Sequence, residues 1–196
     1  MDSKYKLIVD SFGEDRFKFN EPLKEYTSLS SDGKAQLLFI AFNQNELIRI
    51  VKMCRDLKLL FFIFGTGSKI MISDVGFPGL VIKNRTKNIQ VVSVKGKVTK
   101  FGIGVDEALV EVESGLSINK FCEFLNQHEL NSEEFKSIPG SIGGNLFLSR
   151  ILQSKVKSIK VLDQQSQIDD VLAGNLNQRK DIILSAVFKI SAKERY

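Results

Sequence analysis

The sequence predicts an α+β protein, in which a small βαβ subdomain precedes a larger, mainly antiparallel sheet with flanking helices. Two observations lead to this fold class. Over residues 35–64, a strand-like run, a stretch with helical periodicity and a second apolar run follow one another, which is the pattern of a βαβ unit. From about residue 84, short strand-like segments separated by turn signals replace this pattern. We therefore expect a first subdomain at about 22–83 and a second at about 84–190, within a single domain.

The composition indicates a folded protein with an ordinary solvated surface. The chain has 196 residues, of which 43% are hydrophobic and 15 are Phe, and this is enough for a real core. The formal net charge of +5 comes from Lys and Arg that are interleaved with acidic residues, and there is no Trp. Because no basic cluster with stacking aromatics is present, the sequence argues against nucleic-acid binding and supports only a modest attraction for anionic ligands.

Neither export nor membrane spanning is expected. The first ten residues contain no long apolar core, and no run of about 18 apolar residues occurs. Cys54 and Cys122 lie far apart in predicted helices, and neither has a second cysteine or the lone histidine, His128, beside it. We therefore expect buried free thiols in a cytoplasmic protein, and no metal site.

The elements of the first subdomain follow from local patterns. Residues 1–34 show little periodicity beyond Tyr5 to Val9, and Asn20-Glu21-Pro22 and residues 30–33 are expected to form turns. A strand at 35–42 precedes a helix that Asn43 caps, with Glu46 as the partner of Asn43 in a capping box. The uninterrupted apolar run at 61–64 predicts a strand that is buried on both faces, since a half-exposed strand would alternate apolar with polar residues.

The second subdomain is predicted to consist mainly of short strands. Strands are expected at 89–94 and 97–102, and Lys95-Gly96 is a two-residue turn signal between them. Further elements are expected as follows: a strand at 108–113, a helix that begins at Ser117 or Asn119 and ends near His128, and strands at 156–163 and 182–190.

A glycine turn directly after the 61–64 run is the first candidate binding site. It reads Gly65-Thr66-Gly67-Ser68-Lys69 and lies at the carboxyl end of a predicted strand, where the ligands of such sheets gather. Two glycines one residue apart allow positive φ and leave no Cβ to block an approach, so that successive amides can point at one anion. A phosphate of a nucleotide cofactor would suit this loop, but a tight connection between two strands would use the same residues.

A second glycine segment occupies residues 137–145. Pro139 fixes φ and lacks an N–H group, and Gly140 permits a sharp reversal of the chain. Gly143 and Gly144 allow a backbone or a flat ligand to come within van der Waals contact. Two such segments, about seventy residues apart, could flank one extended ligand.

Four motifs, in their order and spacing, make the chain resemble a known family. They are GTGSK, ISDVGFPGLVI, VESGLS and SIPGSIGG. Together they resemble the FAD-binding domain of UDP-N-acetylenolpyruvoylglucosamine reductase, also called UDP-N-acetylmuramate dehydrogenase, over about residues 22–189. The resemblance implies the FAD-binding PCMH-type fold that vanillyl-alcohol oxidase-type flavoproteins share, FAD as the cofactor, and a connection with peptidoglycan precursor synthesis.

The resemblance also implies which residues contact FAD. Backbone amides of the first loop are expected around the pyrophosphate, and the segment 138–144 along the flavin and its ribityl chain. Lys69 departs from the family pattern, which usually has Asn there, and a lysine at this place could strengthen diphosphate binding or point outward. The predicted cofactor contacts are Phe64, Gly65, Thr66, Gly67, Ser68, Lys69, Asp74, Ser114, Gly115, Ile138, Pro139, Gly140, Ser141, Gly143 and Gly144.

The catalytic residues of the family are not recognisable in this chain. The family reduces an enolpyruvyl group with a hydride from NADPH by way of the flavin, and it uses a serine acid, an arginine and a glutamate. The arginine normally lies in a loop with a Tyr-Arg pair, whereas the corresponding loop at 172–180 lacks this pair and has Arg179 as the nearest arginine. The other two residues belong to a C-terminal substrate domain that we expect to be absent. Bulky Leu146, Phe147 and Leu148 also replace small residues beside the isoalloxazine.

Two functions remain open at this point. The first is a non-enzymatic relative, a pseudoenzyme, that keeps the scaffold for binding FAD, another nucleotide or a protein partner. It fits the residues better, because every catalytic position that can be located is altered or absent. The alternative is a flavin-dependent oxidoreductase using NADPH that a partner chain completes. In the first case FAD itself may be retained or lost.

Overall fold

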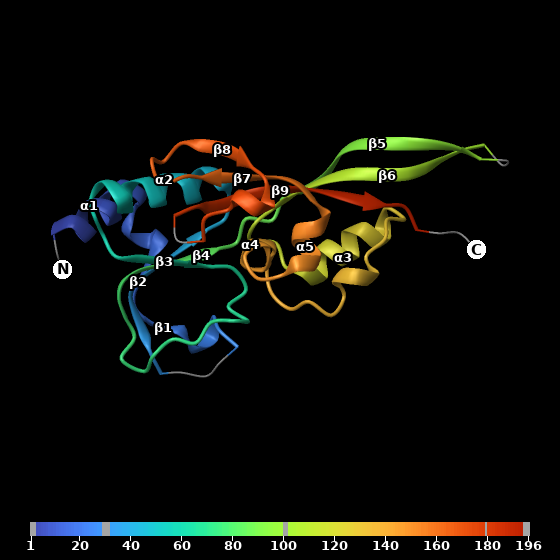
Figure 1. The fold of residues 1–196 in the computed structure, drawn as a ribbon. Coiled ribbons are helices and arrows are strands. Elements are labelled where there is room, and N and C mark those ends of the chain that lie inside the picture. Colours follow the sequence, from blue (N-terminus) through green and yellow to red (C-terminus); the bar gives the residue numbers. More distant parts are fainter. Residues whose placement is uncertain (1–2, 29–31, 100–101, 179, 194–196) are drawn as a thin grey trace. The chain divides into compact units, whose positions relative to one another are not determined.

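The chain folds into two compact units, which are described in turn (Figure 1). The computed structural model describes residues 3–28, 32–99, 102–178 and 180–193. Unit 1 comprises Met1–Thr86 and unit 2 comprises Lys87–Tyr196. Each unit has its own sheet and helices, so the predicted α+β class is confirmed.

Unit 1 contains a four-stranded sheet with the order β1-β2-β4-β3. Its strands are β1 (Phe17–Pro22), β2 (Lys34–Ala41), β3 (Phe61–Phe64) and β4 (Phe77–Asn84). β1 runs antiparallel to β2, whereas β2, β4 and β3 are parallel to their neighbours. The interior strand β4 is buried over residues 79–84, as expected for a strand with a neighbour on each side. The carboxyl ends of β3 and β4 meet at one edge of this sheet, because the two strands pair in parallel register.

The helices of unit 1 are α1 (Ser3–Phe12) and α2 (Gln44–Asp56), with short 3-10 helices at Glu14–Arg16 and Leu23–Glu25. Helix α2 begins at the predicted cap. The Asn43 side chain accepts a hydrogen bond from the Glu46 amide at 2.9 Å, and the Glu46 carboxylate accepts one from the Phe42 amide at 2.9 Å. Helix α1 packs against β2 through Phe12, whose ring meets that of Phe39 edge-on with centroids 5.1 Å apart.

Two expectations for unit 1 are wrong. The predicted turn at Asn20-Glu21-Pro22 instead forms the end of strand β1, and most of residues 3–28, where periodicity is weak outside Tyr5 to Val9, form regular elements. The predicted turn at residues 30–33 lies partly outside the described residues. Strand β3 exists as predicted but is not buried on both faces, because it lies at the edge of the sheet: the Phe62 side chain is 36% exposed, while Phe64 is 4% exposed. Strand β4 takes the interior position, and this pairing of distant segments leaves no local sequence signal.

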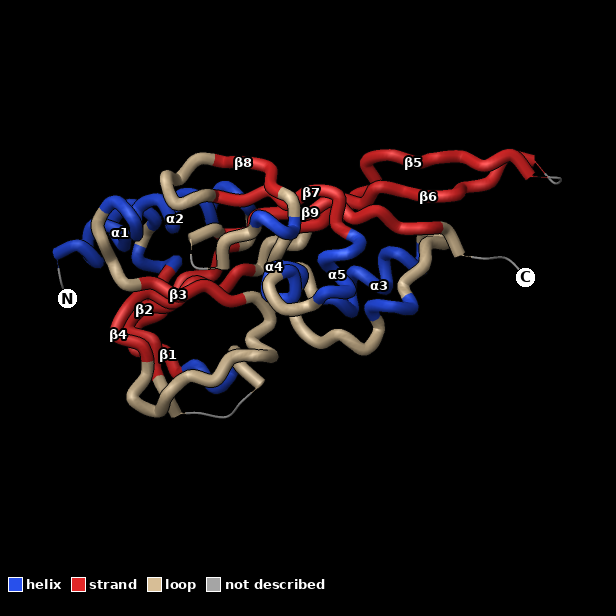
Figure 2. Tube along the Cα trace, in the orientation of Figure 1, coloured by secondary structure: helices blue, strands red, loops and turns tan. Residues whose placement is uncertain are grey.

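Unit 2 is built on a five-stranded sheet with the order β5-β6-β9-β7-β8, in which all neighbours are antiparallel (Figure 2). The strands are β5 (Ile89–Thr99), β6 (Gly102–Glu113), β7 (Val156–Leu162), β8 (Ile168–Val171) and β9 (Ile182–Ser191). The helices are α3 (Ile118–Gln127), α4 (Ile142–Leu146) and α5 (Arg150–Lys155), with 3-10 turns at Glu133–Phe135 and Ala173–Asn175. The rings of Phe121, Phe135 and Phe188 meet in the core with centroids 5.0 to 6.5 Å apart, which fixes α3 on β9.

The predicted turn at Lys95-Gly96 is wrong. Both residues lie inside β5 and pair with β6, as Lys95 with Glu107 and Gly96 with Val105. The register shift between them leaves Asp106 as the extra residue, so a bulge in β6 lies opposite one continuous β5 strand. Helix α3 begins after Ser117, whose hydroxyl accepts a hydrogen bond from the Lys120 amide at 3.3 Å. This cap decides between the two predicted helix starts.

Cys54 and Cys122 are buried free thiols, in agreement with the prediction, and burial raises the pKa of the Cys54 thiol to about 12. Among the described residues, no group of three or more His, Cys, Asp or Glu is placed to hold a metal ion. No helix in the described part of the chain is long and apolar enough to cross a membrane.

Candidate functional site

The first candidate segment is the loop Gly65-Thr66-Gly67-Ser68-Lys69, which follows β3 at the carboxyl end of that parallel strand. Gly67 has a φ of 76°, and a Cβ on it would lie 2.1 Å from the Tyr26 carbonyl oxygen. The Gly67 carbonyl also accepts a hydrogen bond from the Ser28 amide at 3.2 Å. Glycine is therefore required at this position because the loop packs directly on the backbone of residues 26–28.

Three successive amides of this loop have no acceptor among the described residues, although Gly67 itself is buried. Within the described part of the chain, no group accepts a hydrogen bond from the backbone amides of Thr66, Gly67 and Ser68. The hydroxyls of Thr66 and Ser68 lie 3.1 Å apart and bond to each other, which ties the two ends of this tripeptide together. Adjacent N–H groups held in a tight turn are the usual protein site for a phosphate oxygen.

A buried lysine that the sequence analysis missed lies behind the loop. Lys83, near the end of β4, is 7% exposed, and its Nζ donates a hydrogen bond to the Gly65 carbonyl at 3.4 Å. The ammonium also lies 4.8 Å from the ring centroid of Phe64 and 5.3 Å from that of Tyr26. Burial, together with the like charge of Arg85, lowers the pKa of Lys83 to about 8. The sequence does contain a signal for this residue, because Lys83 follows directly on the apolar run of β4, and a lysine in such a strand is expected to be buried.

Two further residues near this loop, Asp74 and Lys69, are predicted to contact the cofactor. The Asp74 side chain is exposed and accepts a hydrogen bond from the Asp32 amide at 3.2 Å, while the Gly76 amide donates to the Ser73 carbonyl at 2.8 Å and closes the turn around Asp74. Lys69 is exposed. Their predicted contact with a cofactor remains a prediction.

In unit 2, the structure brings the predicted residues near 114 and those of the second glycine segment together. The Gly143 amide donates to the Ser114 carbonyl at 2.8 Å, and the Ile142 amide donates to the Leu116 carbonyl at 2.8 Å. The Ile118 amide returns a hydrogen bond to the Gly140 carbonyl at 2.9 Å. Two amides and one carbonyl of the second glycine segment are therefore hydrogen-bonded to the chain segment that follows β6.

The two adjacent glycines of this segment differ in their surroundings. A Cβ on Gly143 would lie 3.0 Å from the Ser114 Cβ and 3.2 Å from the Ser114 carbonyl oxygen, whereas a Cβ on Gly144 would meet only the Ser141 hydroxyl, at 3.6 Å. Gly144 is exposed. Close backbone approach thus explains Gly143, and Gly144 is the position of this pair that has room for an external group.

The bulky residues after Gly144 are divided between the core and the surface. Asn145 is fully buried and donates hydrogen bonds to the carbonyls of Pro139 and Ser141, at 3.0 and 2.9 Å. Leu146 is also fully buried and belongs to the core of unit 2, whereas Leu148 is 64% exposed. Of the remaining predicted contacts in this segment, Ile138 is half-buried and Pro139 is exposed.

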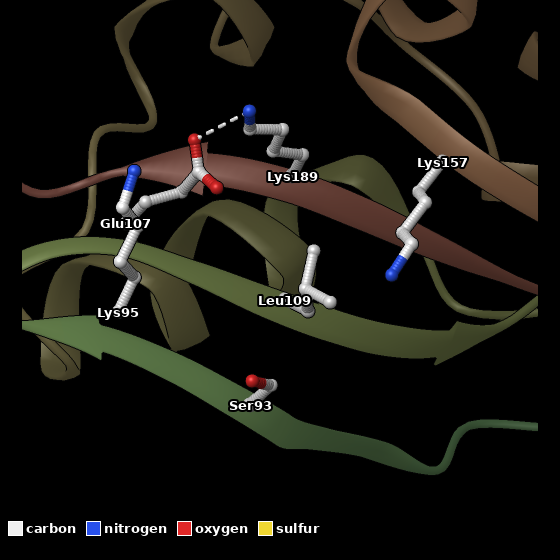
Figure 3. Close-up of a pocket in the computed structure, with 6 residues that line it drawn as sticks. All are labelled: Ser93, Lys95, Glu107, Leu109, Lys157 and Lys189. Carbon is white, nitrogen blue, oxygen red and sulfur yellow. Dashed lines mark ion pairs between the residues drawn. The ribbon is translucent and has the colours of Figure 1, made fainter.

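The structure adds no catalytic residue in the described part of the chain. Arg179, the nearest candidate for the arginine of the family, lies outside the described residues. A hollow of about 300 Å³ lies on unit 2, and Glu107 and Lys189 form an ion pair of 2.9 Å at it. Figure 3 shows its lining residues and this ion pair. The residues that line it are Ser93, Lys95, Glu107, Leu109, Lys157 and Lys189. This set contains no predicted cofactor contact, so we do not place the site there.

Comparison with known proteins identifies the class. The family model described as "FAD binding domain" matches residues 35–149, a range that contains both glycine segments and the residues near 114. The chain belongs to this family of FAD-binding domains.

Within this family, the chain is similar in sequence to one group of enzymes. A UDP-N-acetylenolpyruvoylglucosamine reductase of Caldanaerobacter subterraneus is 30% identical over 173 residues, which cover 83% of this chain and 53% of the relative. The reductase of Clostridium perfringens is 28% identical over 173 residues, with 85% and 53% covered. The resemblance predicted from the four motifs is thereby confirmed, and the chain spans about half the length of the curated relatives it matches.

Solved structures show the fold. A UDP-N-acetylenolpyruvylglucosamine reductase from Thermus caldophilus matches with a TM-score of 0.62 at 16% identity, covering 91% of this chain and 62% of that one. A p-cresol methylhydroxylase matches with a TM-score of 0.61 at 11% identity, covering 100% of this chain and 45% of that one. These likenesses confirm the predicted FAD-binding PCMH-type fold.

Proposed function

We propose that this chain binds FAD and that its own contribution is to bind and orient the cofactor. The observation that carries the proposal is the loop after β3, where three consecutive amides have no protein acceptor in the described part of the chain. Membership in the FAD-binding domain family supports FAD as the ligand of such a loop. Bound FAD would supply two-electron redox chemistry.

The proposed contacts in each unit are distinct. The amides of Thr66, Gly67 and Ser68 would donate hydrogen bonds to diphosphate oxygens, since these amides are adjacent and unused. The segment 138–144 and the neighbouring Ser114 and Gly115 would contact the flavin and its ribityl chain. In that segment Gly144 has room for a flat ligand, since only the Ser141 hydroxyl lies near its missing side chain.

We further propose that the chain by itself is a binding module and not an active reductase. The loop at 172–180 lacks a Tyr-Arg pair, which the resemblance associates with the catalytic arginine. A second candidate function is a flavin-dependent oxidoreductase using NADPH that a partner chain completes. The names of the relatives favour this candidate, since they are reductases of which the matched region covers 53%.

The visible absorbance spectrum of the purified protein tests the first proposal. Oxidised-flavin bands that persist after incubation with FAD and desalting are the expected result, and a colourless protein that takes up no FAD would contradict it. Steady NADPH oxidation by the FAD-loaded chain, with the enolpyruvyl substrate or an artificial acceptor, then separates the two candidates. No turnover is expected of a binding module, and turnover would favour the oxidoreductase.

A further inference from the structure

We infer that Lys83 supplies the counter-charge for the diphosphate that the Gly65–Lys69 loop holds. This inference rests on the proposed FAD binding and adds a binding residue from β4, a strand outside the glycine motif. Lys83 approaches the loop through Gly65, the residue that immediately precedes the three available amides. The Gly65 carbonyl and the Thr66 amide belong to one trans peptide group and point in opposite directions, so the ammonium would act on an anion at the amides through the field of its charge and by polarising this peptide.

The surroundings of Lys83 show why an anion is needed. A charged side chain that is 93% buried normally has a partner of opposite charge, because burial removes its hydration. Among the described residues, no carboxylate lies within 4.0 Å of the Lys83 ammonium. The groups that do face it are the Gly65 carbonyl and the rings of Phe64 and Tyr26, which compensate a positive charge only in part.

The other charged groups around Lys83 do not neutralise it. Arg85 directly follows the last residue of β4. It carries the same charge as Lys83 and opposes the protonation of Lys83. The Tyr26 hydroxyl bonds to Glu21 at 2.7 Å and to Lys18 at 2.8 Å, so this acid already has a cationic partner. The region behind the loop therefore retains a net positive charge, which a diphosphate would balance.

A purely structural lysine would behave differently from a counter-charge. If Lys83 only fills space between Phe64 and Tyr26, an uncharged residue of similar length would serve equally well. If it balances a diphosphate, its removal would weaken ligands that carry phosphate and spare a flavin without phosphate. Bound diphosphate would also hold the Lys83 ammonium in its protonated form.

Binding titrations of Lys83→Met test the inference. The ligands are FAD, inorganic pyrophosphate and riboflavin, and the matched control is Lys6→Met, which removes the same charge from an exposed position of α1 in the same unit. We expect the Kd for FAD and pyrophosphate to rise about tenfold or more in Lys83→Met. Riboflavin affinity should be unchanged, and Lys6→Met should match the unsubstituted chain.

A second measurement uses the unsubstituted chain and does not depend on the variant folding. NMR titration of the lysine ammonium groups should show that saturating pyrophosphate raises the pKa of Lys83 by about one unit or more. If the chain binds FAD but Lys83→Met binds it equally well, or if pyrophosphate leaves the Lys83 titration unchanged, the inference is overturned while FAD binding stands. If the chain binds neither FAD nor pyrophosphate, the proposed function fails and the inference fails with it.

Discussion

The two glycine segments of this chain look alike in sequence but use their backbone groups in opposite ways. In the Gly65–Lys69 loop, three successive amides have no acceptor in the described part of the chain, and a buried ammonium lies behind them. In the segment 138–144, the amides of Ile142 and Gly143 and the carbonyl of Gly140 bond to residues 114–118, which follow β6. The first segment therefore keeps amides for the anion that we propose it binds, whereas part of the second holds its own chain together.

This difference shows that glycine content alone does not distinguish a binding loop from a structural one. Gly67 and Gly143 are both required by close protein contacts, with Tyr26 and with Ser114. What distinguishes the segments is the set of polar groups that remain unpaired after these contacts are made. Substitutions that touch the free amides of the first segment should therefore affect ligand binding, and those that break contacts in the second should affect stability. Gly67 should affect both, because it belongs to the first segment and packs on Tyr26.

The largest expected effect is that of Gly67→Ala. The new Cβ would lie 2.1 Å from the Tyr26 carbonyl oxygen in a residue with a φ of 76°, so the loop must move. We expect a loss of about 3 to 4 kcal/mol in the free energy of unfolding and loss of FAD retention. Urea denaturation measures the first effect. Gly174→Ala is the matched control, because nothing lies within 4 Å of its added Cβ. Equal urea midpoints for the two variants would contradict the claim that the contact with Tyr26 requires glycine at position 67.

The uncompensated charge behind the first loop predicts an unusual pH dependence. The pKa of Lys83 is about 8 in the folded chain and near 10.5 when exposed, so the unfolded chain holds more protons between these values. Without ligand, stability should rise with pH through this window by about 3 kcal/mol in total, and the cost of the buried charge is fully present below pH 8. Tyr26 and Arg85 face the same region.

Denaturation at several pH values between 7 and 10 checks this prediction. Lys83→Met should be the more stable chain at pH 7, by about 1 to 2 kcal/mol, and should lack the rise attributed to the lysine. Lys6→Met should keep that rise. A pH dependence that is the same in Lys83→Met and in the unsubstituted chain would show that the buried charge is not the cause.

In the second segment, Asn145→Ala should destabilise unit 2 without a direct effect on the loop of unit 1. The fully buried amide donates to the Pro139 and Ser141 carbonyls, and its removal leaves both acceptors without this donor. We expect a loss of about 2 kcal/mol in the free energy of unfolding. Pyrophosphate affinity, measured by calorimetry under folded conditions, should stay within about twofold of the original, and a large change would contradict the division of roles.

The smallest effects are expected for the adjacent pair Gly143→Ala and Gly144→Ala. Gly143→Ala crowds Ser114 and should reduce stability by about 1 kcal/mol, whereas Gly144→Ala has room and should change it by less than about 0.5 kcal/mol. If a flat ligand approaches Gly144, only this second variant should weaken FAD binding while the thermal midpoint is kept. A lower thermal midpoint for Gly144→Ala than for Gly143→Ala would show that the close contacts with Ser114 do not determine the stability of this segment.

Local signals predicted the parts of the fold that short-range chemistry determines. The caps at Asn43 and Ser117 follow from side chains that bond to amides three residues later. The interior position of β4 and the bulge opposite Gly96 depend on pairing between distant segments, so a local pattern could not show them. This is also why the apolar β3 run was expected to be buried on both faces.

The candidate site was predictable in the same limited way. The sequence located both glycine segments and the residues near 114, since glycine clusters after strands are a local signal. It could not show that Gly67 packs on Tyr26, because this contact joins residues about forty positions apart. Lys83 was missed for a similar reason, since its burial behind the loop depends on the parallel pairing of β3 and β4.

The most direct test of the contrast between the two segments is an NMR titration of the backbone amides with inorganic pyrophosphate. A chain of 196 residues is small enough for its amide signals to be followed individually. The largest shifts should occur at Thr66, Gly67 and Ser68, while the amides of Ile142 and Gly143, which are already hydrogen-bonded, should stay in place. Unmoved signals at 66–68, or larger shifts at 142–143, would contradict the assignment of the first loop as the anion-binding segment.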